Sequence, residues 1–494
     1  MIGTFVIALY FLLLVILAIF GAHRYYNLSI YLKTRNQRIE PKGHFEELPP
    51  VTVQVPVYNE KYVIARVIDA VCRLDYPKEK LQIQILDDST DDTTAIAAEK
   101  VRFYKAQGYD IELHHRNHRS GFKAGALEEG LKVAKGEFIA IFDADFVPPR
   151  DFLKRIIHYF TDPKVGMVQA RWGHINRNTN LLTKVQSIFL DGHFLIEHVA
   201  RNRSGRFFNF NGTAGIWRKE AIFDAGGWEH DTLTEDIDLS YRAQMKGWKF
   251  IYLPDVVVPA ELPVDIHAFK TQQHRWAKGA MQVAKKLLPV IFKSNLRFDI
   301  KAEAFFHMCG NIAYLLMVPF SLLVFPVMLL RRGLGLEKLI IIDAPLFILA
   351  TASVGAFYLV TIKDLYKDWP SMVKYLPALM AIGIGLAVNN AWAVVEALLD
   401  KPSEFERTPK YGIVSEKPDW KRKIYKGRRT WVTWIELLLA IYFNFAVYSA
   451  IKHGVFVSLP FVMLFQYGYT YMATLSIIQM LDLGKSKEQV LETK

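Results

Sequence analysis

The sequence predicts an α/β domain with a mostly parallel sheet, joined to an all-α domain that crosses the membrane several times. Of the 494 residues, 51% are hydrophobic, and apolar residues are concentrated in 1–20 and in most of 305–480. Residues 51–300 have the composition of a soluble domain. They alternate short β-branched segments with helical patterns, which indicates a parallel sheet with helices on both faces.

Apolar runs of about 18 or more residues are long enough to cross a bilayer. Such runs occur at 2–22, 305–330, 339–362, 375–399, 434–451 and 455–480. The first run has no basic region before it and no small-residue cleavage site after it, so we interpret it as a retained anchor and not as a secretory signal. The sequence therefore predicts a multi-pass integral membrane protein.

The predicted domains follow from these boundaries. A basic cytoplasmic linker and an α/β domain come after the anchor, then a polar motif with an interface helix, and then membrane segments separated by a basic loop. The ranges are 1–22 for the anchor, 23–49 for the linker, 50–270 for the α/β domain, 271–304 for the motif and interface helix, 305–362 for two membrane helices, 375–399 for a second interface helix, 400–433 for the loop, 434–480 for two membrane helices, and 481–494 for a cytoplasmic tail.

The net charge of +12 is compatible with nucleic-acid binding, but its distribution argues against that function. Residues 401–433 contain 10 Lys/Arg and 4 Asp/Glu, a surplus of +6, and a second basic cluster follows the first apolar run. Basic residues beside membrane spans mark the cytoplasmic side and contact anionic lipids. We therefore expect membrane lipids and no nucleic acid as partners; attraction of an anionic substrate is the other interpretation. The two cysteines, Cys72 and Cys309, indicate neither a disulfide framework nor a cysteine zinc site.

The strand pattern of the α/β domain places acidic residues at strand ends. Strands are predicted at 51–60, 81–90, 137–146 and 164–172, with helices at 63–74 and 92–108 between them. Ligands of open α/β sheets bind at the carboxyl ends of the strands. The sequence therefore predicts a ligand site at this edge.

Two pairs of aspartates lie at these strand ends. Asp87 and Asp88 end the second strand, where an N-cap of the helix that opens near Asp91 is an equally simple explanation. Asp143 and Asp145 alternate along the third strand, which predicts that both point to one face. Two like charges held close together need a neutralising cation, and Mg²⁺ or Mn²⁺ suits such oxygen ligands and also a bound diphosphate.

Two further stretches suit a ligand, one a phosphate and the other a sugar. Lys123 stands at the start of a predicted helix, where a phosphate binds well, although a surface lysine would give the same pattern. Residues 208–218 are rich in Gly and small polar residues, which suits a backbone close to a sugar and equally suits a turn. In 232–243, Thr234 is expected to cap a helix whose first turn holds Glu235 and Asp236. Capping explains that pattern fully, so it does not by itself assign chemistry to Asp236.

The stretch "TQQHRWAKG" (271–279) places a guanidinium and an indole beside the predicted site. Arg275 is suited to neutralising a diphosphate, and Trp276 offers a flat face to a sugar ring. Trp276 as an interfacial membrane anchor is the alternative interpretation. Residues 280–293 then predict an amphipathic helix on the membrane surface.

Taken in order, these motifs resemble family 2 glycosyltransferases with a GT-A fold, in the cellulose synthase superfamily. The resemblance is carried by Asp88, by Asp143 and Asp145, by Thr234-Glu235-Asp236, and by Gln272 with Arg275 and Trp276. Longer strings are similar to the cellulose synthase-like subfamilies A and C, which make mannan or glucomannan and β-1,4-glucan. These strings are "LDDSTDDT", "GFKAGAL", "FDADFVPPRDFL", "VQARWGHIN", "FNGTAGIWR", "KGWKFIYL" and "QQHRWAKG".

The resemblance implies an inverting transfer from a nucleotide sugar, UDP-glucose or GDP-mannose, with Mg²⁺ or Mn²⁺ as cofactor. It implies that Asp236 is the general base, with Glu235 and Arg275 also catalytic, and that Asp143 and Asp145 hold the metal. A loop similar to the gating loop of cellulose synthases lies at 405–412, and Pro409 between its Thr and Lys departs from the family pattern. Implied nucleotide-sugar contacts are Tyr58, Glu60, Asp87, Asp88, Lys123, Asp143, Thr408 and Lys410, and implied acceptor contacts are Asn211, Gly212, Thr213, Gln272 and Trp276.

Two functions follow from the resemblance. The first is a processive synthase that extends a β-1,4-linked polysaccharide and passes it through its own channel, and the second adds one sugar to a lipid acceptor. For either function, the catalytic domain and the 405–412 loop are expected on the cytoplasmic side of the membrane. That membrane is expected to be a bacterial inner membrane, or a Golgi or plasma membrane if the source is eukaryotic. Three apolar segments separate them, so one must not cross, and the polar residues of 375–399 select that segment.

Overall fold

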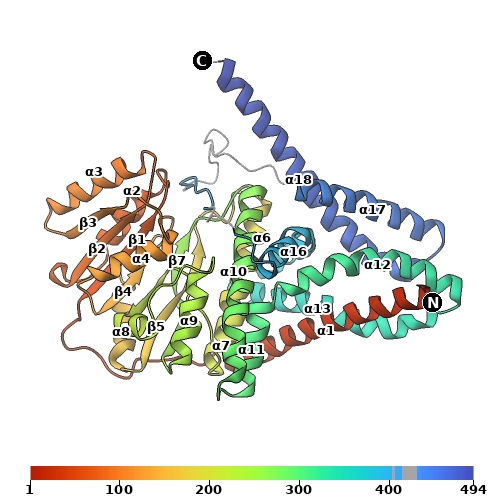
Figure 1. Cartoon of the computed structure of the whole chain (residues 1–494), viewed down its shortest axis with the longest axis horizontal. Coiled ribbons are helices and arrows are strands. Elements are labelled where there is room, and N and C mark those ends of the chain that lie inside the picture. The colour runs from red at the N-terminus through yellow and green to blue at the C-terminus, as the bar shows by residue number, and fades with distance from the viewer. Residues whose placement is uncertain (1, 403–406, 414–430, 493–494) are drawn as a thin grey trace.

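The computed structural model describes residues 2–402, 407–413 and 431–492. Figure 1 shows two parts, an α/β domain and a group of long helices, with helix α10 (Ile266–Lys293) standing between them. The N-terminus lies at the end of the helical part that is far from the sheet.

The α/β domain contains a seven-stranded sheet in the order β3-β2-β1-β4-β6-β5-β7. All neighbouring strands are parallel except at β6, which runs antiparallel to both β4 and β5. The fold class predicted from the sequence is therefore confirmed, although the sequence prediction missed β3, β6 and β7. The strands are β1 (Val51–Val57), β2 (Leu81–Asp87), β3 (Asp110–His115), β4 (Phe138–Ile141), β5 (Val165–His174), β6 (Gly215–Arg218) and β7 (Lys249–Ala260).

Side chains alternate between two hydrophobic cores, one on each face of the sheet. In β4, Phe138 and Ala140 belong to one core and Ile139 and Ile141 to the other. The first core is covered by α2 (Ile64–Cys72), α3 (Thr93–Lys105) and α5 (Phe152–Ile157), and the second by α4 (Phe122–Lys132), α8 (Lys219–Asp224) and α9 (Glu235–Met245). Helices on both faces leave the carboxyl ends of the strands free for a ligand site.

Helix α10 is longer than the sequence predicts. The expected helix at 280–293 is the second half of one helix that begins at Ile266, so the predicted boundary between 270 and 271 falls inside it. Asp265 caps this helix by accepting a hydrogen bond from Ala268 N at 2.7 Å. Helix α11 (Phe298–Cys309) follows, and a break at Gly310 divides the predicted segment 305–330 between α11 and α12.

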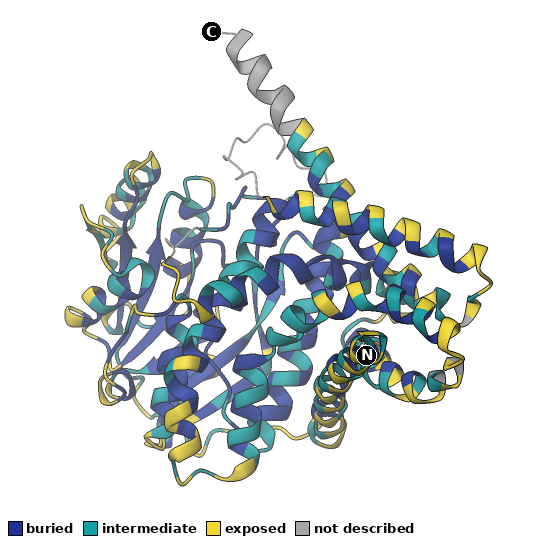
Figure 2. Cartoon of the chain, turned by 45° about the vertical axis from the view of Figure 1, so that its right-hand side comes forward, coloured by how far each residue is buried: buried dark blue, intermediate teal, exposed yellow. Residues whose placement is uncertain are grey.

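Within the described residues, six helical stretches are long and apolar enough to cross a membrane. Five of them are 28–39% buried along their most apolar window, and Figure 2 shows exposed positions along the long helices. The exposed residues of these helices include large apolar side chains such as Phe5, Leu12 and Leu438. The sixth, Trp369–Leu398, is 78% buried. The helices are α1 (Ile2–Thr34), α12 (Ile312–Leu334), α13 (Ile340–Leu365), the set α14 (Trp369–Met372), α15 (Leu376–Gly385) and α16 (Ala387–Leu398), then α17 (Val432–Lys452) and α18 (Leu459–Glu492).

Buried charges join α10 to the membrane helices. Lys270 Nζ donates to Glu436 of α17 at 2.5 Å and to Ser476 of α18 at 2.8 Å, and all three residues are buried. Lys278 contacts Glu396 of α16 at 3.2 Å. Each of these charges is compensated only while both parts are in place, because a buried charge without a partner is strongly unfavourable.

Candidate active site

A cavity of about 170 Å³ opens at the carboxyl ends of the strands, between the sheet and α10. Strand-end loops, the start of α9, one face of α10 and the segment 407–413 all contribute to its wall. Most residues that the sequence assigned to the site meet here. They are Tyr58, Glu60, Asp88, Lys123, Asp143, Asp145, Asn211, Gly212, Glu235, Asp236, Gln272, Arg275, Trp276, Thr408 and Lys410.

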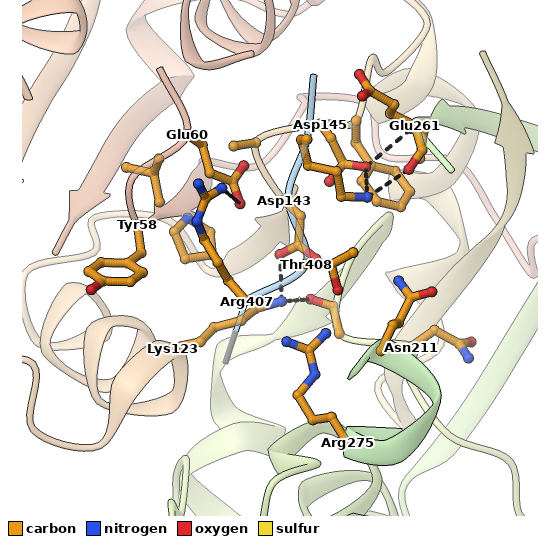
Figure 3. A pocket seen from close by; sticks show the side chains of 18 of the residues that line it. Tyr58, Glu60, Lys123, Asp143, Asp145, Asn211, Glu261, Arg275, Arg407 and Thr408 are labelled. Atoms are coloured by element: carbon orange, nitrogen blue, oxygen red, sulfur yellow. Dashed lines mark hydrogen bonds and ion pairs between the residues drawn. The ribbon is translucent and has the colours of Figure 1, made fainter. Parts of the chain in front are cut away.

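Asp143 and Asp145 lie in the turn after β4 and not within the strand. Strand β4 ends at Ile141, because its pairing with β1 and β6 ends there, so the predicted alternation along a strand was wrong. Each carboxylate nevertheless faces the cavity and contacts a lysine, Asp143 Oδ1 at 2.5 Å from Lys123 Nζ and Asp145 Oδ2 at 2.7 Å from Lys410 Nζ (Figure 3).

Lys123 is held inside the cavity wall and is not a surface lysine. Its ammonium also donates to the carbonyl oxygen of Gly212 at 2.9 Å. Burial lowers the pKa of Lys123, but Asp143 and Glu235 outweigh that effect and raise it, so the side chain stays charged. Gly212 has φ +78°, and a Cβ there would lie 3.1 Å from Asp236 Oδ2, so a larger residue would displace the expected base.

Two predicted contacts do not line this cavity. Asp87 is fully buried, and its carboxylate accepts hydrogen bonds from Ser89 N, the Thr94 hydroxyl and the ring of His115. Thr213 is also fully buried and accepts a hydrogen bond from Asp143 N at 2.9 Å. Both residues therefore support the loops behind the site, and their assignments as nucleotide and acceptor contacts stay predictions that the cavity lining does not support.

Asp88 lines the cavity and is fixed by a two-point contact with Arg116. The guanidinium donates from Nε to Oδ1 at 2.7 Å and from Nη2 to Oδ2 at 2.5 Å. Neither Asp87 nor Asp88 is the N-cap residue of α3, because that residue is Asp92. The capping interpretation of the first aspartate pair is therefore excluded.

Helix α9 brings two carboxylates to the cavity in its first turn. Thr234 is the N-cap residue but makes no side-chain capping hydrogen bond, so the predicted cap is absent at this position. Burial, and then the charge of Glu235, raise the pKa of Asp236 to about 7. Burial also raises the pKa of Glu235. A carboxylate with a pKa near neutrality is well suited to accepting a proton from a sugar hydroxyl.

We expect the rate to depend on pH through this pair. Asp236 must be ionised to act as a base, so kcat/KM should fall about tenfold per pH unit below about pH 7 and level off above it. The Glu235→Gln variant removes a neighbouring negative charge and should move the descending limb to lower pH. A flat profile between about pH 5.5 and 8 would contradict this assignment.

Gln272, Arg275 and Trp276 lie on one face of α10 and point into the protein. Burial lowers the pKa of Arg275, while Glu235 and Asp143 oppose that shift. Trp276, together with Asp236, Asn211 and Gln272, lines both the first cavity and a second one of about 410 Å³. An indole in this position faces the cavities and not lipid headgroups, which excludes the membrane-anchor interpretation.

The segment 407–413 closes one side of the cavity; the preceding positions 405–406 of the predicted loop lie outside the described residues. Its Thr408 and Lys410 line the cavity, and so does Arg407, which the sequence prediction omitted and which lies 3.8 Å from Glu60. Burial raises the pKa of Glu60 to about 8, although Arg407 lowers it.

Several other lining residues were missed at the sequence level. The guanidinium of Arg119 lies 3.5 Å from the centre of the Tyr58 ring, and Trp172, His174 and Glu261 also line the cavity. Trp172 and His174 stood in the string "VQARWGHIN", and an indole and an imidazole in the last residues of a strand were a usable signal. Arg119 and Glu261 had no such signal, because only the fold brings them to this edge.

A separate cluster of Glu229, Asp231 and Asp238 has oxygen atoms close enough for a metal ion. Lys286 contacts all three carboxylates, so an ammonium already neutralises them. This cluster does not include the two aspartates of the cavity.

Comparisons with known proteins agree with this geometry. Residues 49–279 match a family described as "Glycosyltransferase like family 2". The chain is 37% identical over 375 residues to glucomannan 4-beta-mannosyltransferase 1 of Oryza sativa subsp. japonica, a match that covers 73% of this chain and 71% of the relative. It is 41% identical over 310 residues to glucomannan 4-beta-mannosyltransferase 2 of Arabidopsis thaliana, covering 60% and 58%.

Among solved structures, the mannosyltransferase PcManGT from Pyrobaculum calidifontis, in complex with GDP-Man and Mn²⁺, has a similar fold. The TM-score is 0.54 at 23% identity, and the match covers 79% of this chain and all of that one. The sheet, the site at its carboxyl edge and the sequence relatives lead to one conclusion. The chain belongs to the family 2 glycosyltransferases, hexosyl-transferring enzymes, and within them it is related to the glucomannan 4-beta-mannosyltransferases.

Proposed function

We propose that this enzyme transfers mannose from GDP-mannose to a growing β-1,4-linked mannan or glucomannan and passes the polymer across the membrane. The names of its relatives, and the GDP-Man in the PcManGT complex, favour this donor over UDP-glucose. The observation that carries the proposal is a series of adjoining cavities that lead from the donor site into the helical part of the molecule.

These cavities share walls. The first and second have Trp172, Asn211, Asp236, Gln272 and Trp276 in common. The second continues between α1 and α11–α13, where its lining contains both aromatic and polar side chains. It shares further residues with a third cavity, of about 230 Å³, and these are Phe20, Arg24, Phe189, Gly310, Ala313, Tyr314 and Tyr358. A sugar chain held by stacking would leave the site along this path.

The chemistry follows from the position of each group. Asp236 takes the proton of the acceptor hydroxyl, whose oxygen attacks the anomeric carbon while the bond to the diphosphate breaks on the opposite side, which inverts the configuration. Lys123 and Arg275 stabilise the negative charge that develops on the leaving diphosphate. Trp276, at the junction of the two cavities, orients the acceptor sugar.

The residues at the cavity fit a divalent cation. Asp143 and Asp145 offer hard oxygen ligands, and their contacts with Lys123 and Lys410 support a position that is favourable for positive charge. Mg²⁺ or Mn²⁺ bound there would supply charge stabilisation for the diphosphate.

Transfer of one sugar to a lipid acceptor is the second candidate function. It is favoured by the third cavity, whose lining is mostly Leu, Phe, Ala and Met and therefore suits an acyl chain. The two functions differ in product. Incubation of the full-length protein in detergent with labelled GDP-mannose or UDP-glucose tests them: the proposal requires a polymer from GDP-mannose that a β-1,4-mannan hydrolase degrades. A labelled glycolipid, or a product made only from UDP-glucose, would overturn it.

Variants of two α10 residues, Trp276 and Arg275, should affect polymer elongation and donor hydrolysis differently. Trp276→Ala removes the stacking surface, so polymer elongation should fall by about 2- to 10-fold, as expected for the loss of about 0.5–1.5 kcal/mol of ring contact, while slow hydrolysis of the donor persists. Arg275→Ala should impair both reactions, because both need the diphosphate to leave. Equal losses in both assays for both variants would contradict this division.

The expected topology is supported by the ends of the segment 369–398. Near its start, Arg177 contacts Met372 and Lys184 contacts Tyr375; at its end, Lys278 contacts Glu396. Both ends therefore meet the catalytic side, as expected of a segment that enters and returns without crossing.

Cysteine labelling in oriented vesicles checks this topology. Lys401→Cys should react from the same face as Lys135→Cys in the catalytic domain, and Lys338→Cys, between α12 and α13, should react from the opposite face. If Lys401→Cys and Lys338→Cys react from one face, the segment crosses the membrane and the proposed topology is wrong.

A further inference from the structure

Glu261 lines the first cavity, at the carboxyl ends of the strands, yet the chemistry proposed above gives it no role. It follows β7, is 2% exposed, and connects two segments that are distant in sequence. Its backbone N–H donates to Asp145 Oδ2 at 3.1 Å, and its carbonyl oxygen accepts from Lys410 Nζ at 2.6 Å. Its carboxylate accepts from Tyr411 N at 2.6 Å and from Ile413 N at 3.0 Å.

The position of segment 407–413 depends on this carboxylate. The segment has no regular secondary structure, so the N–H groups of Tyr411 and Ile413 have no ladder or helix to satisfy them. Both N–H groups are buried, and each donates to a different oxygen atom of the Glu261 carboxylate. The side chains of Tyr411 and Ile413 pack on Val264. Without Glu261 these donors would be left unsatisfied in the interior, which would release the segment.

Docking of segment 407–413 brings Lys410 to Asp145, one of the two aspartates proposed to hold the metal. Its ammonium lies 2.7 Å from Asp145 Oδ2, the same oxygen atom that accepts the N–H of Glu261 (Figure 3). A divalent cation bound to that oxygen would stand within about 5 Å of the ammonium, and two positive charges at such a separation repel each other in a buried site. The two cations therefore exclude each other at Asp145.

We propose that Glu261 is a positioning residue that docks segment 407–413, and that the docked Lys410 competes with the divalent cation for Asp145. The inference rests on the metal site of the proposed function. Metal binding and docking of the segment are then linked: each weakens the other by the same factor.

Binding of Mn²⁺ alone, without nucleotide sugar, tests one side of this linkage. Electron paramagnetic resonance of free Mn²⁺ measures its affinity for the full-length protein in detergent. Lys410→Met removes the competitor and should tighten Mn²⁺ binding about tenfold, the equilibrium value of one charged hydrogen bond. Glu261→Gln, which cannot accept from both backbone N–H groups, should tighten it in the same direction. Lys135→Met, which removes an exposed lysine far from the cavity, should not change it, and Asp145→Asn should abolish the difference.

Accessibility of the segment tests the other side. Ile413 is 2% exposed, and the native Cys72 and Cys309 are both buried, so an Ile413→Cys variant reports undocking by its rate of reaction with a maleimide. Mn²⁺ should accelerate this reaction in the otherwise native protein and leave it unchanged when Lys410→Met is also present.

The outcomes separate this inference from the proposed function. Equal, measurable Mn²⁺ affinities of the native protein and Lys410→Met, or a labelling rate that Mn²⁺ does not alter, would overturn the competition and leave the metal site intact. Failure of every variant to bind Mn²⁺ would overturn both.

Discussion

Replacement of Asp236 by Asn should lower turnover by about 10²- to 10⁴-fold, the usual contribution of a general base, while donor binding survives. Asparagine keeps nearly the same shape but cannot take a proton from the acceptor hydroxyl. The side chain lines both cavities, beside Gly212 and Trp276, where an acceptor and a donor would meet. Single-turnover transfer and equilibrium binding of GDP-mannose to the purified variant measure the two effects separately.

Asp231→Asn is the matched control for this variant. Asp231 is an exposed carboxylate near the start of α9 that contacts Lys286 and lies outside the cavity, so its replacement should leave turnover within about twofold of the native value. Near-normal turnover of Asp236→Asn would show that the aspartate serves only the helix start.

Asp145→Asn should abolish transfer, with a loss of about 10³-fold or more, because several kcal/mol of metal stabilisation would be lost. Donor binding should weaken as well, since the diphosphate would be held through the same ion. The native enzyme should lose activity in excess chelator and regain it with Mn²⁺ or Mg²⁺. Full activity in excess chelator would contradict the metal assignment.

Asp162→Asn provides a control of similar burial, because this aspartate lies near the start of β5, contacts Lys42 and is far from the cavity. It should change stability without a change in metal dependence. A metal dependence that shifts equally in both variants would show that the effect is not specific to Asp145.

Local sequence pattern predicted the parts of this fold that follow from periodicity. The β-branched runs at 51–57 and 81–87 alternate with helical stretches, and this placed β1, β2 and the edge that carries the site. The predicted strand at 137–146 ended too late because pairing with neighbouring strands, and not local propensity, sets where β4 ends. Strand β6 is as short as β4 but begins at Gly215 and ends at Arg218, so it lacks the continuous apolar run that marked β4 in the sequence.

The site was predictable where side-chain chemistry is unusual for its surroundings. Arg275 and Trp276 beside an apolar region were such a signal, and so were two aspartates after an apolar strand. Asp87 lies behind the cavity that Asp88 lines, and the sequence could not separate the two, because an aspartate that ties loops together has the same sequence context as one that faces a ligand. Glu261 was missed because its partners, Tyr411 and Ile413, lie about 150 residues further along the chain.

The buried charges along α10 determine which segments must stay together when a chimera is made from two relatives of this enzyme. Lys270 pairs with Glu436 and Ser476, and Lys278 with Glu396, so a graft that takes α10 from one relative and α16–α18 from another splits each pair between two parents. A mismatched parent leaves an ammonium or a carboxylate alone in the interior, at about 3–5 kcal/mol for each broken pair. Donor-specificity chimeras should therefore exchange the strand-end loops and keep α10 and its helices from one parent.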